Sequence, residues 1–390
     1  AINFSTYGAS FVFVDDQGET LAPLYNYLKP YPEKLKEEFY ARYGGEEKIA
    51  TETASPVLGS LNSGMQLFRI REEKPELFNR IKYALHLPQY MSMLISRQFF
   101  SDKTSIGCHT QLWDFEQDDY HQWVCNEKIA VKMAPVFPSD GVLPGRFRHH
   151  EILVGVGLHD SSAALIPYLQ QFDEPFVLLS TGTWSIALNP FDQSELSTQD
   201  LIQDCLSYLS FEGKPVKASR LFAGNEHEQQ VKRIAAHFGT SNSKYRSLHY
   251  QPEIAEAVAE KYPAKEARSY QAESDFARRE LSAFANDLEA YYQLMADLVH
   301  QQVYSLKLIV KEAPVKDIYV DGGFSKNDIY MHLLAAALKP VQVFAAMVSQ
   351  ATAIGTALAI HRYWNRKTYP ADIVQLIPYS SGASPNLKTK

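Results

Sequence analysis

The chain has 390 residues, of which 45% are apolar, 12% aromatic and 21% charged; this composition suits about two folded domains and excludes a disordered chain. Its formal net charge of −7 argues against nucleic acid as the main partner, because binding a phosphate backbone needs a surplus of Lys and Arg on one face. No stretch approaches the roughly 20 apolar residues of a membrane span.

The three cysteines, Cys108, Cys125 and Cys205, are far apart in the sequence. They form no disulfide framework and no metal-ligand spacing. The first 25 residues also lack the basic-then-apolar pattern of a secretory signal. We therefore expect a reduced, cytoplasmic protein.

The first 150 residues are expected to form one α/β domain. A strand over 9–16 and a turn at Gln17-Gly18 predict a hairpin with the segment near Leu21. The helical patterns that follow cover 34–42, 64–71, 75–86 and 87–94. A cluster of Pro, Ser, Asp and Gly between Ala134 and Gly145 predicts the domain boundary near residue 150.

A second α/β domain is expected over 151–365. Its predicted strands cover 151–157, 175–180 and 315–320, and its predicted helices cover 226–238, 273–312, 328–338 and 351–364. The apolar ladder of the long helix indicates a core-facing stripe. Residues 366–390 are expected to be a tail, with a loose end at 380–385.

Three short segments, each directly after a run of β-formers, carry the candidate chemistry. They are Gly157-Leu158-His159-Asp160-Ser161-Ser162, Ser180-Thr181-Gly182-Thr183-Trp184 and Asp321-Gly322-Gly323-Phe324-Ser325-Lys326-Asn327. Polar groups at the ends of strands are where α/β sheets bind ligands. The sequence contains neither a Gly-x-x-x-x-Gly-Lys-Ser/Thr loop nor a Gly-x-Gly-x-x-Gly after a strand, so a P-loop ATPase and a dinucleotide dehydrogenase are not supported.

Asp160 stands between a strand and an Ala-rich helix, and its residue type there permits two roles. It can be a general base beside an attacking hydroxyl, or simply the N-cap of the helix.

His149 and His150, which are neighbours in the sequence, are with Glu151 no strong metal candidate, because neighbouring strand residues point to opposite faces.

These segments, together with Thr6-Tyr7-Gly8-Ala9-Ser10-Phe11-Val12 near the start, resemble the FGGY carbohydrate kinases, and most closely their L-fuculose and L-rhamnulose kinase branch. The resemblance runs from Ile2 to about Tyr363. It implies two RNase H-like (actin-like ATPase) domains with a cleft between them. It also implies an ATP- and Mg²⁺-dependent kinase that acts on a primary hydroxyl of a deoxyketose.

The same resemblance assigns roles to residues of this chain. Asp160 would be the proton acceptor and His159 a sugar contact. Tyr7 and Gly8 would border the sugar, and Asn225 would contact it from the second domain. The implied ATP residues are Thr181, Gly182 and Thr183 at the β- and γ-phosphates and Gly322, Gly323 and Asn327 at the adenosine. Gly355 would let the helix 351–359 pack close to the nucleotide pocket, whereas Asp102, Cys108 and His109 are interpreted as packing residues.

The sequence departs from the pattern of rhamnulose kinases at two positions that concern the substrate. Position 7 is tyrosine where rhamnulose kinases tend to carry tryptophan, and position 10 is serine where they tend to carry aspartate. Both favour L-fuculose. The expected partners are a small sugar and ATP, with no nucleic acid or membrane, and a homodimer is the expected assembly.

A third departure concerns the opening of the chain. Actin-like phosphotransferases normally begin with a strand and an Asp-x-Gly-Thr-Thr phosphate loop, whereas this sequence starts with Ala1-Ile2-Asn3-Phe4-Ser5. We expect a kinase whose first domain lacks its opening strands in this sequence. The alternative is a catalytically inactive protein that binds sugar or nucleotide and keeps Asp160 as a helix cap.

Overall fold

A computed structural model describes residues 1–263, 274–311, 314–348, 350–370 and 372–380. The chain forms two compact units, each assembled from separate stretches of sequence. Unit 1 comprises 1–171, 193–217 and 349–371, and unit 2 comprises 172–192, 218–348 and 372–390. The boundary expected near residue 150 falls inside unit 1. Residues on both sides of it form one hairpin, in which Phe147 pairs with His150.

The strands of unit 1 form short pairs rather than one broad sheet. β1 (Ser5–Thr6) runs parallel to β8 (Leu158–His159). The antiparallel pairs are β2 (Phe11–Val14) with β3 (Tyr83–His86), β4 (Trp113–Asp114) with β5 (Asp119–Tyr120), and β6 (Val142–Phe147) with β7 (His150–Gly155). β11 (Cys205–Leu209) also belongs to this unit.

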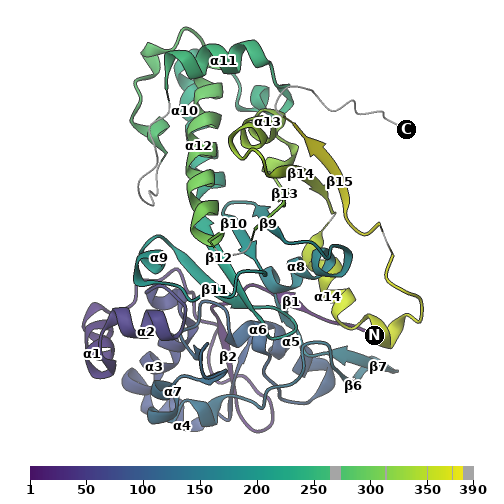
Figure 1. Ribbon diagram of the computed structural model, residues 1–390. Helices are drawn as coiled ribbons and strands as arrows, with labels where there is room; N and C mark the ends of the chain where they lie inside the picture. Colours follow the sequence, from purple (N-terminus) through teal and green to yellow (C-terminus); the bar gives the residue numbers. More distant parts are fainter. Residues whose placement is uncertain (264–273, 312–313, 349, 371, 381–390) are drawn as a thin grey trace. The chain divides into compact units, whose positions relative to one another are not determined.

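Helices surround an aromatic core in unit 1. Phe39, Phe68 and Trp123 are almost completely buried, with the Phe39 ring centroid 4.9 Å from that of Phe68 and 5.0 Å from that of Trp123. Figure 1 shows α1–α4 gathered with α7 around this core. The helices of the unit are α1 (Glu33–Tyr43), α2 (Glu46–Glu52), α3 (Ser63–Glu73), α4 (Pro75–Arg80), α5 (Leu87–Ser96), α6 (Lys103–Ile106), α7 (Gln122–Asn126), α8 (Asp160–Gln171), α9 (Thr198–Ile202), α14 (Ala351–Ala359) and α15 (His361–Trp364).

Unit 2 is built on a sheet with the strand order β12-β10-β9-β13-β14-β15. β13 (Asp317–Gly322) runs parallel to both β9 (Phe176–Thr181) and β14 (Gln342–Met347). β10 (Ser185–Asn189) forms an antiparallel hairpin with β9, and β15 (Gln375–Tyr379) lies antiparallel to β14. β12 (Pro215–Leu221) enters the unit at Ala218.

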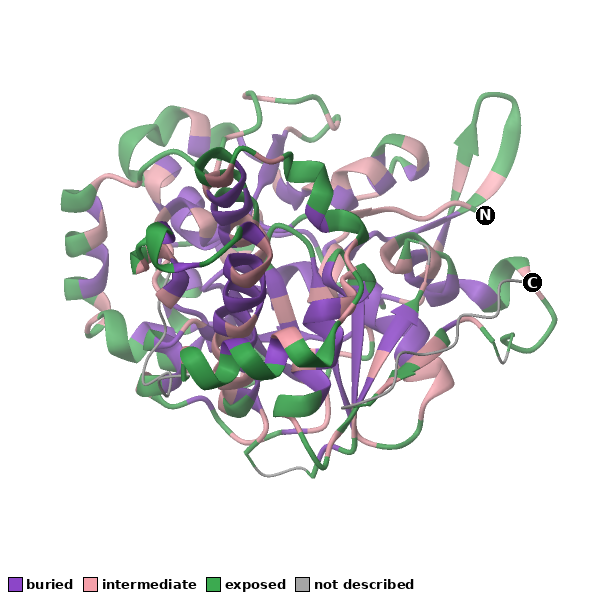
Figure 2. Cartoon of the chain, turned by 90° about the horizontal axis from the view of Figure 1, so that it is seen from above, coloured by how far each residue is buried: buried purple, intermediate pink, exposed green. Residues whose placement is uncertain are grey.

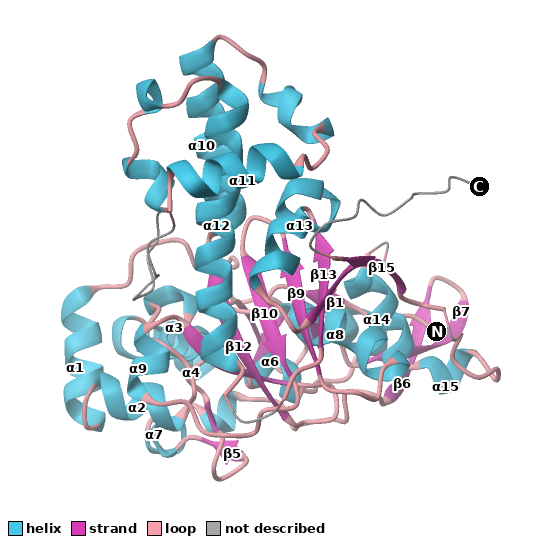
Figure 3. Ribbon diagram, turned by 45° about the horizontal axis from the view of Figure 1, so that its top comes forward, coloured by secondary structure: helices cyan, strands magenta, loops and turns pink. Residues whose placement is uncertain are grey.

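Four α-helices accompany this sheet. They are α10 (Ala223–Phe238), α11 (Pro252–Lys261), α12 (Asp287–Ile309) and α13 (Asp328–Ala337). α12 packs against α10, α11 and α13, as Figure 3 shows. Its apolar stripe is buried, including Met295, Leu298 and Leu306, so the interpretation as a core-facing stripe is confirmed. Buried residues fill the strands of the sheet (Figure 2). α12 is buried or half-buried at every position except Lys307.

Most predicted elements are present, but four differ. Residues 75–86 split into α4 and the strand β3, whose buried Ala84 and Leu85 fit either structure by pattern. The long helix begins only at Asp287, because the Asn286 side chain accepts a hydrogen bond from the amide of Glu289 at 2.9 Å and caps it. Among the preceding residues, 275–278 and 281–283 form 3₁₀ turns, and 273 lies outside the described residues.

The other two differences lie near the C-terminal end. The helix predicted over 351–364 is interrupted at Ile360, which separates α14 from α15. Residues 375–379, assigned to the tail by sequence, are the strand β15 of the unit 2 sheet; most of the loose end predicted at 380–385 lies outside the described residues. Among the helices that the structure describes, none is both long and apolar enough to cross a membrane.

Close packing of α8 against α14 depends on a glycine. A methyl group at Gly355 would overlap the carbonyl oxygen of Ala163, one turn into α8. The expectation that Gly355 serves a close approach is right, and the neighbour that it meets is the backbone of α8 in the same unit. The predicted packing of this helix beside a nucleotide stays a prediction.

Replacing Gly355 with alanine should therefore destabilise the protein. Helix propensity alone predicts a gain of up to about 1 kcal/mol in stability from this change, whereas the overlap with Ala163 should cost about 2 kcal/mol. We expect a lower midpoint in urea unfolding. Ala357→Ser, on the exposed face of the same helix, is the control and should change stability by less than about 0.5 kcal/mol. A higher midpoint for Gly355→Ala would contradict the close approach.

Candidate active site

The pairing of β1 with β8 assembles the first group of predicted site residues. Ser5 lies opposite Leu158 and Thr6 opposite His159. Because the strands are parallel, the residues that follow them emerge at the same edge. Tyr7 and Gly8 thus come beside His159 and Asp160. We call these four residues the Asp160 cluster, and all of them belong to unit 1.

Gly8 permits a close approach within this cluster. A methyl group on it would come within 2.9 Å of Cys108 Sγ and 3.2 Å of His159 Nε2. Both distances are shorter than ordinary van der Waals contact. Any side chain at position 8 would therefore displace the imidazole or the thiol, so the glycine is required by the packing of His159.

Asp160 is the first residue of α8 and remains accessible. Its Oδ1 accepts a hydrogen bond from the amide of Ser161 at 2.7 Å and lies 3.3 Å from His159 Nε2. Its side chain is 44% exposed. Both interactions use Oδ1, so among the described residues no hydrogen bond or ion pair uses Oδ2. The carboxylate therefore caps the helix with one oxygen and presents the other to solvent.

Two contacts hold His159 in place. Its backbone amide donates to Thr104 Oγ1 at 2.9 Å, and its ring stacks on Tyr208 with centroids 5.3 Å apart. Burial lowers the pKa of His159 below its ordinary value, although the Asp160 carboxylate opposes the shift. The imidazole is therefore neutral at pH 7 and can accept as well as donate a hydrogen bond.

Asp102 supports the position of His159 indirectly, through Thr104. It is fully buried, caps α6 through the amides of Thr104 and Ser105, and accepts hydrogen bonds from the hydroxyls of Thr104 and Ser139. Burial raises its pKa to about 6, against the effect of these hydrogen bonds. The interpretation of Asp102 as a structural residue fits these contacts. Sequence reasoning missed Thr104; the only signal was its place two residues after a capping aspartate.

The second group of predicted residues lies in unit 2, where β9 and β13 end side by side. Gly322 pairs with Thr181 across the parallel ladder, and the amide of Gly323 donates to the Thr181 carbonyl at 2.8 Å. The Thr181 hydroxyl donates to the Asp321 carbonyl and accepts from the amide of Phe324 at 3.0 Å. We name Thr181–Thr183 with Gly322 and Gly323 the Thr181 turn. The buried Thr181 joins its two strands.

The glycines of the Thr181 turn differ in what surrounds them. Gly322 has a φ of +82°, and a methyl group on it would overlap the Thr181 carbonyl. Gly182 and Gly323 are exposed, and a methyl group there would meet its nearest neighbour only at 3.8 Å and 3.9 Å. The fold therefore requires Gly322, whereas the bare backbone at 182 and 323 leaves open space that a ligand can approach closely. The amides of these two glycines already donate to the carbonyls of Trp184 and Thr181.

Asn225 and Asn327 both lie in unit 2. The backbone amide of Asn225 donates to the Thr183 carbonyl at 3.1 Å, which places it beside the Thr181 turn. Asn327 caps α13 by accepting from the amide of Tyr330 at 3.0 Å and donates to the Tyr291 hydroxyl at 2.8 Å. These contacts give Asn327 a structural role. Its predicted adenosine contact, and the predicted sugar contact of Asn225, stay predictions.

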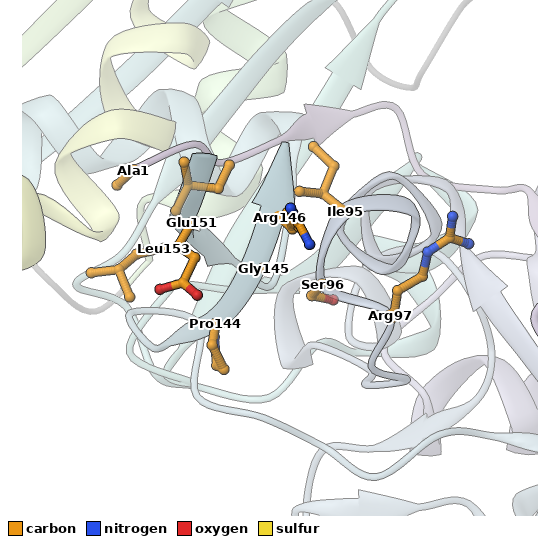
Figure 4. Close-up of a pocket in the computed structure, with 10 residues that line it drawn as sticks. Ala1, Ile95, Ser96, Arg97, Pro144, Gly145, Arg146, Glu151 and Leu153 are labelled. Carbon is orange, nitrogen blue, oxygen red and sulfur yellow. The ribbon is translucent and has the colours of Figure 1, made fainter. Parts of the chain in front are cut away.

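A depression elsewhere on unit 1 contains none of the predicted residues. It has a volume of about 700 Å³ and is lined by the end of α5, the hairpin β6–β7 and Ala1. Figure 4 shows Arg97, Arg146 and Glu151 among its lining side chains. It therefore adds nothing to either group of site residues.

Comparisons with known proteins identify the family of this chain. Residues 173–368 match the family described as "Carbohydrate kinase FGGY, C-terminal domain". A protein of Bacteroides thetaiotaomicron named rhamnulokinase is 23% identical over 97% of this chain and 80% of its own length. A rhamnulokinase of Klebsiella pneumoniae is 26% identical over 48% of this chain and 38% of its own length. With that second protein, the matched region is less than half of the relative.

Solved structures share the fold at lower identity. A carbohydrate kinase from Novosphingobium aromaticivorans superposes with a TM-score of 0.78 at 20% identity, covering 97% of this chain and 82% of the other. A ligand-bound xylulose kinase from Lactobacillus acidophilus gives 0.75 at 13% identity, covering 97% and 79%. Such structures have two actin-like ATPase domains, so the α/β fold class expected from sequence is confirmed.

Gly322 and Gly323 form a matched pair for testing the Thr181 turn. Gly322→Ala should lower the free energy of unfolding by more than about 2 kcal/mol, because alanine is strained at positive φ and its methyl group meets the Thr181 carbonyl. Gly323→Ala should change it by less than about 1 kcal/mol, since the added methyl group has room. Urea unfolding of both variants measures this. Equal losses would show that the turn is not held as described.

Proposed function

We propose that this chain, which belongs to the FGGY carbohydrate kinases, phosphorylates a primary hydroxyl of a deoxyketose with Asp160 as general base. The observation that carries the proposal is the accessible Asp160 carboxylate at the end of β8, beside a buried neutral histidine for whose ring Gly8 leaves room. A base of this kind must lie within hydrogen-bond reach of the hydroxyl that it deprotonates.

The two carboxylate oxygens of Asp160 support the role of general base, because capping the helix occupies only one of them. Capping needs one acceptor, and Oδ1 already serves the amide of Ser161. Oδ2 is then available to a sugar hydroxyl. His159 also has a ring nitrogen that is not used in the fold, because its buried Nδ1 has no hydrogen-bond partner among the described residues. We propose that His159 binds a sugar hydroxyl and that Tyr7 and Gly8 border the sugar.

The nucleotide side of the proposal rests on the Thr181 turn. FGGY kinases use ATP and a divalent metal, and we propose Mg²⁺ as that metal. ATP supplies the phosphoryl group. The open space beside Gly182 and the exposed hydroxyl of Thr183 fit phosphate oxygens, which can approach a bare backbone closely and accept hydrogen bonds from hydroxyls. We propose that Gly182 and Thr183 receive the β- and γ-phosphates, with Gly322, Gly323 and Asn327 toward the adenosine.

The contacts of Tyr7 and Ser10 discriminate between candidate sugars less sharply than the sequence alone suggests. Tyr7 is 40% exposed, with its ring 5.6 Å from that of Tyr27, so it can contact a ligand. Ser10 is buried, and its hydroxyl donates to the carbonyl of Tyr25 at 3.4 Å. The serine therefore weighs less as a specificity residue than its position suggests. Because the named relatives are rhamnulokinases, we propose L-fuculose and L-rhamnulose together as the candidate substrates. A cytoplasmic homodimer remains a prediction.

Replacement of Asp160 by asparagine tests the general base. Asparagine keeps a cap for the Ser161 amide, so the midpoint of thermal unfolding should hardly change. The rate of ADP release with Mg²⁺-ATP and L-fuculose or L-rhamnulose should fall by about 10²- to 10⁴-fold, because the proton acceptor is lost.

The outcomes separate the candidate functions. Turnover that disappears in Asp160→Asn while the fold is retained supports the kinase and its base together. Turnover that survives the substitution would reject Asp160 as the base. Binding of sugar or ATP in calorimetry without any turnover of either sugar would instead favour the inactive binding protein.

Gly182 offers a separate test of the phosphate site. The fold leaves room for a methyl group at this position, so Gly182→Ala should change the free energy of unfolding by less than about 1 kcal/mol. If phosphate oxygens approach the backbone here, the added methyl group obstructs them. The KM for ATP should rise about tenfold or more while the KM for the sugar stays constant. An unchanged KM for ATP would exclude Gly182 from the phosphate site.

A further inference from the structure

Three buried side chains with metal-binding atoms meet beside Asp160. They are Cys108, His109 and His159, which are 1%, 8% and 3% exposed. Each offers one ligand atom, and these three atoms all lie within 4.8 Å of one another. Cys108 and His109 play no part in the proposed transfer, so the grouping has no explanation in that reaction.

The position of Gly8 shows how two of these side chains are oriented. A methyl group on Gly8 would lie 2.9 Å from Cys108 Sγ and 3.2 Å from His159 Nε2. The sulfur and this nitrogen therefore converge on the same space. Asp160 Oδ1 is 3.3 Å from the same Nε2, so the Asp160 carboxylate can add an oxygen ligand to the group.

This set of ligands matches the chemistry of zinc. Zn²⁺ binds thiolate, imidazole and carboxylate in tetrahedral sites, with metal–ligand distances of about 2.0–2.3 Å, which places the ligand atoms roughly 3.3–3.7 Å apart. Separations within 4.8 Å thus need only small side-chain movements. Mg²⁺ is unsuited, because it prefers oxygen ligands in an octahedral arrangement.

We propose that Cys108, His109 and His159 bind Zn²⁺, with the Asp160 carboxylate as the fourth ligand. The Cys108 thiol releases its proton to solvent when its sulfur binds the ion. The bound ion engages the carboxylate that serves as general base and the histidine that serves the sugar. Zn²⁺ is therefore an inhibitor that competes with the sugar; this inhibition rests on the proposed function, whereas the binding does not.

A cobalt titration tests the binding without any need for activity. Co²⁺ replaces Zn²⁺ in tetrahedral sites and reports a thiolate ligand through a charge-transfer band in the near ultraviolet. We expect that band in the reduced parent protein, its loss on addition of one equivalent of Zn²⁺, and its absence in Cys108→Ser. The matched control is Cys125→Ser, at an exposed cysteine, which should retain the band.

His109→Gln checks the second ligand and guards against a folding defect in the first variant. It should weaken Co²⁺ binding at least tenfold, with far-ultraviolet circular dichroism confirming that each variant is folded. Absence of the thiolate band in the parent protein, or an equal band in Cys108→Ser, would overturn the proposed site. Both results are independent of whether the chain has kinase activity.

Kinetics then test the inhibition. In an active preparation, Zn²⁺ should raise the KM for the sugar without changing the KM for ATP, and Cys108→Ser should raise the inhibition constant at least tenfold. Inhibition that is competitive with ATP, or equal in parent and variant, would reject this part of the proposal. Total absence of turnover with an intact cobalt band would reject the proposed function and leave the zinc site standing.

Discussion

The parallel pairing of β1 with β8 is the constraint on which the Asp160 cluster depends. It comprises only two residue pairs, Ser5 with Leu158 and Thr6 with His159, yet these join parts of the chain more than 150 residues apart. Asn3 reinforces the pairing, because its side chain accepts a hydrogen bond from the amide of Gly157 at 3.2 Å and donates to the carbonyl of Thr356 at 2.9 Å. A single asparagine thus connects β1, the turn before β8, and α14.

Supporting contacts explain why the site residues hold their positions with few hydrogen bonds of their own. The side chains of Gln89 and Ser92 in α5 donate to the carbonyls of Gly157 and Gly155, both at 2.8 Å. Asp102 holds Thr104, which in turn receives the amide of His159. Hydrogen bonds between buried polar groups of this kind favour one arrangement of the backbone. Asp160 can therefore remain accessible without losing its orientation.

The sequence predicts the strand ends well and the helix limits less well. Gly157 through Asp160, and Asp321 through Asn327, follow runs of apolar β-formers, and such local signals need no tertiary information. Residues 75–86 were misassigned because Ala84 and Leu85 suit a buried strand and a buried helix equally; pairing with β2 decides the outcome. The start of α12 was also placed too early, although Asn286 is a recognisable cap.

The roles of individual polar residues were harder to predict, because they depend on partners distant in sequence. The structural role of Asn327 is visible only from its hydrogen bonds to Tyr330 and Tyr291, whereas its adenosine contact stays a prediction. Ser10 resembles a specificity residue until its burial is known. The spacing of Cys108 and His109 gives no sign of their grouping with His159, because a contact distant in sequence, between Thr104 and the amide of His159, joins the two stretches.

The contact between α8 and α14 also has a consequence for the order in which the protein can be made. Unit 1 gathers residues 1–171, 193–217 and 349–371, and the helix that begins with Asp160 packs against Gly355. During synthesis the ribosome must therefore produce nearly the whole of unit 2 before α8 acquires its neighbour. The surface of α8 that will contact α14 stays uncovered throughout that interval, so unit 1 depends on late translation to complete its native packing.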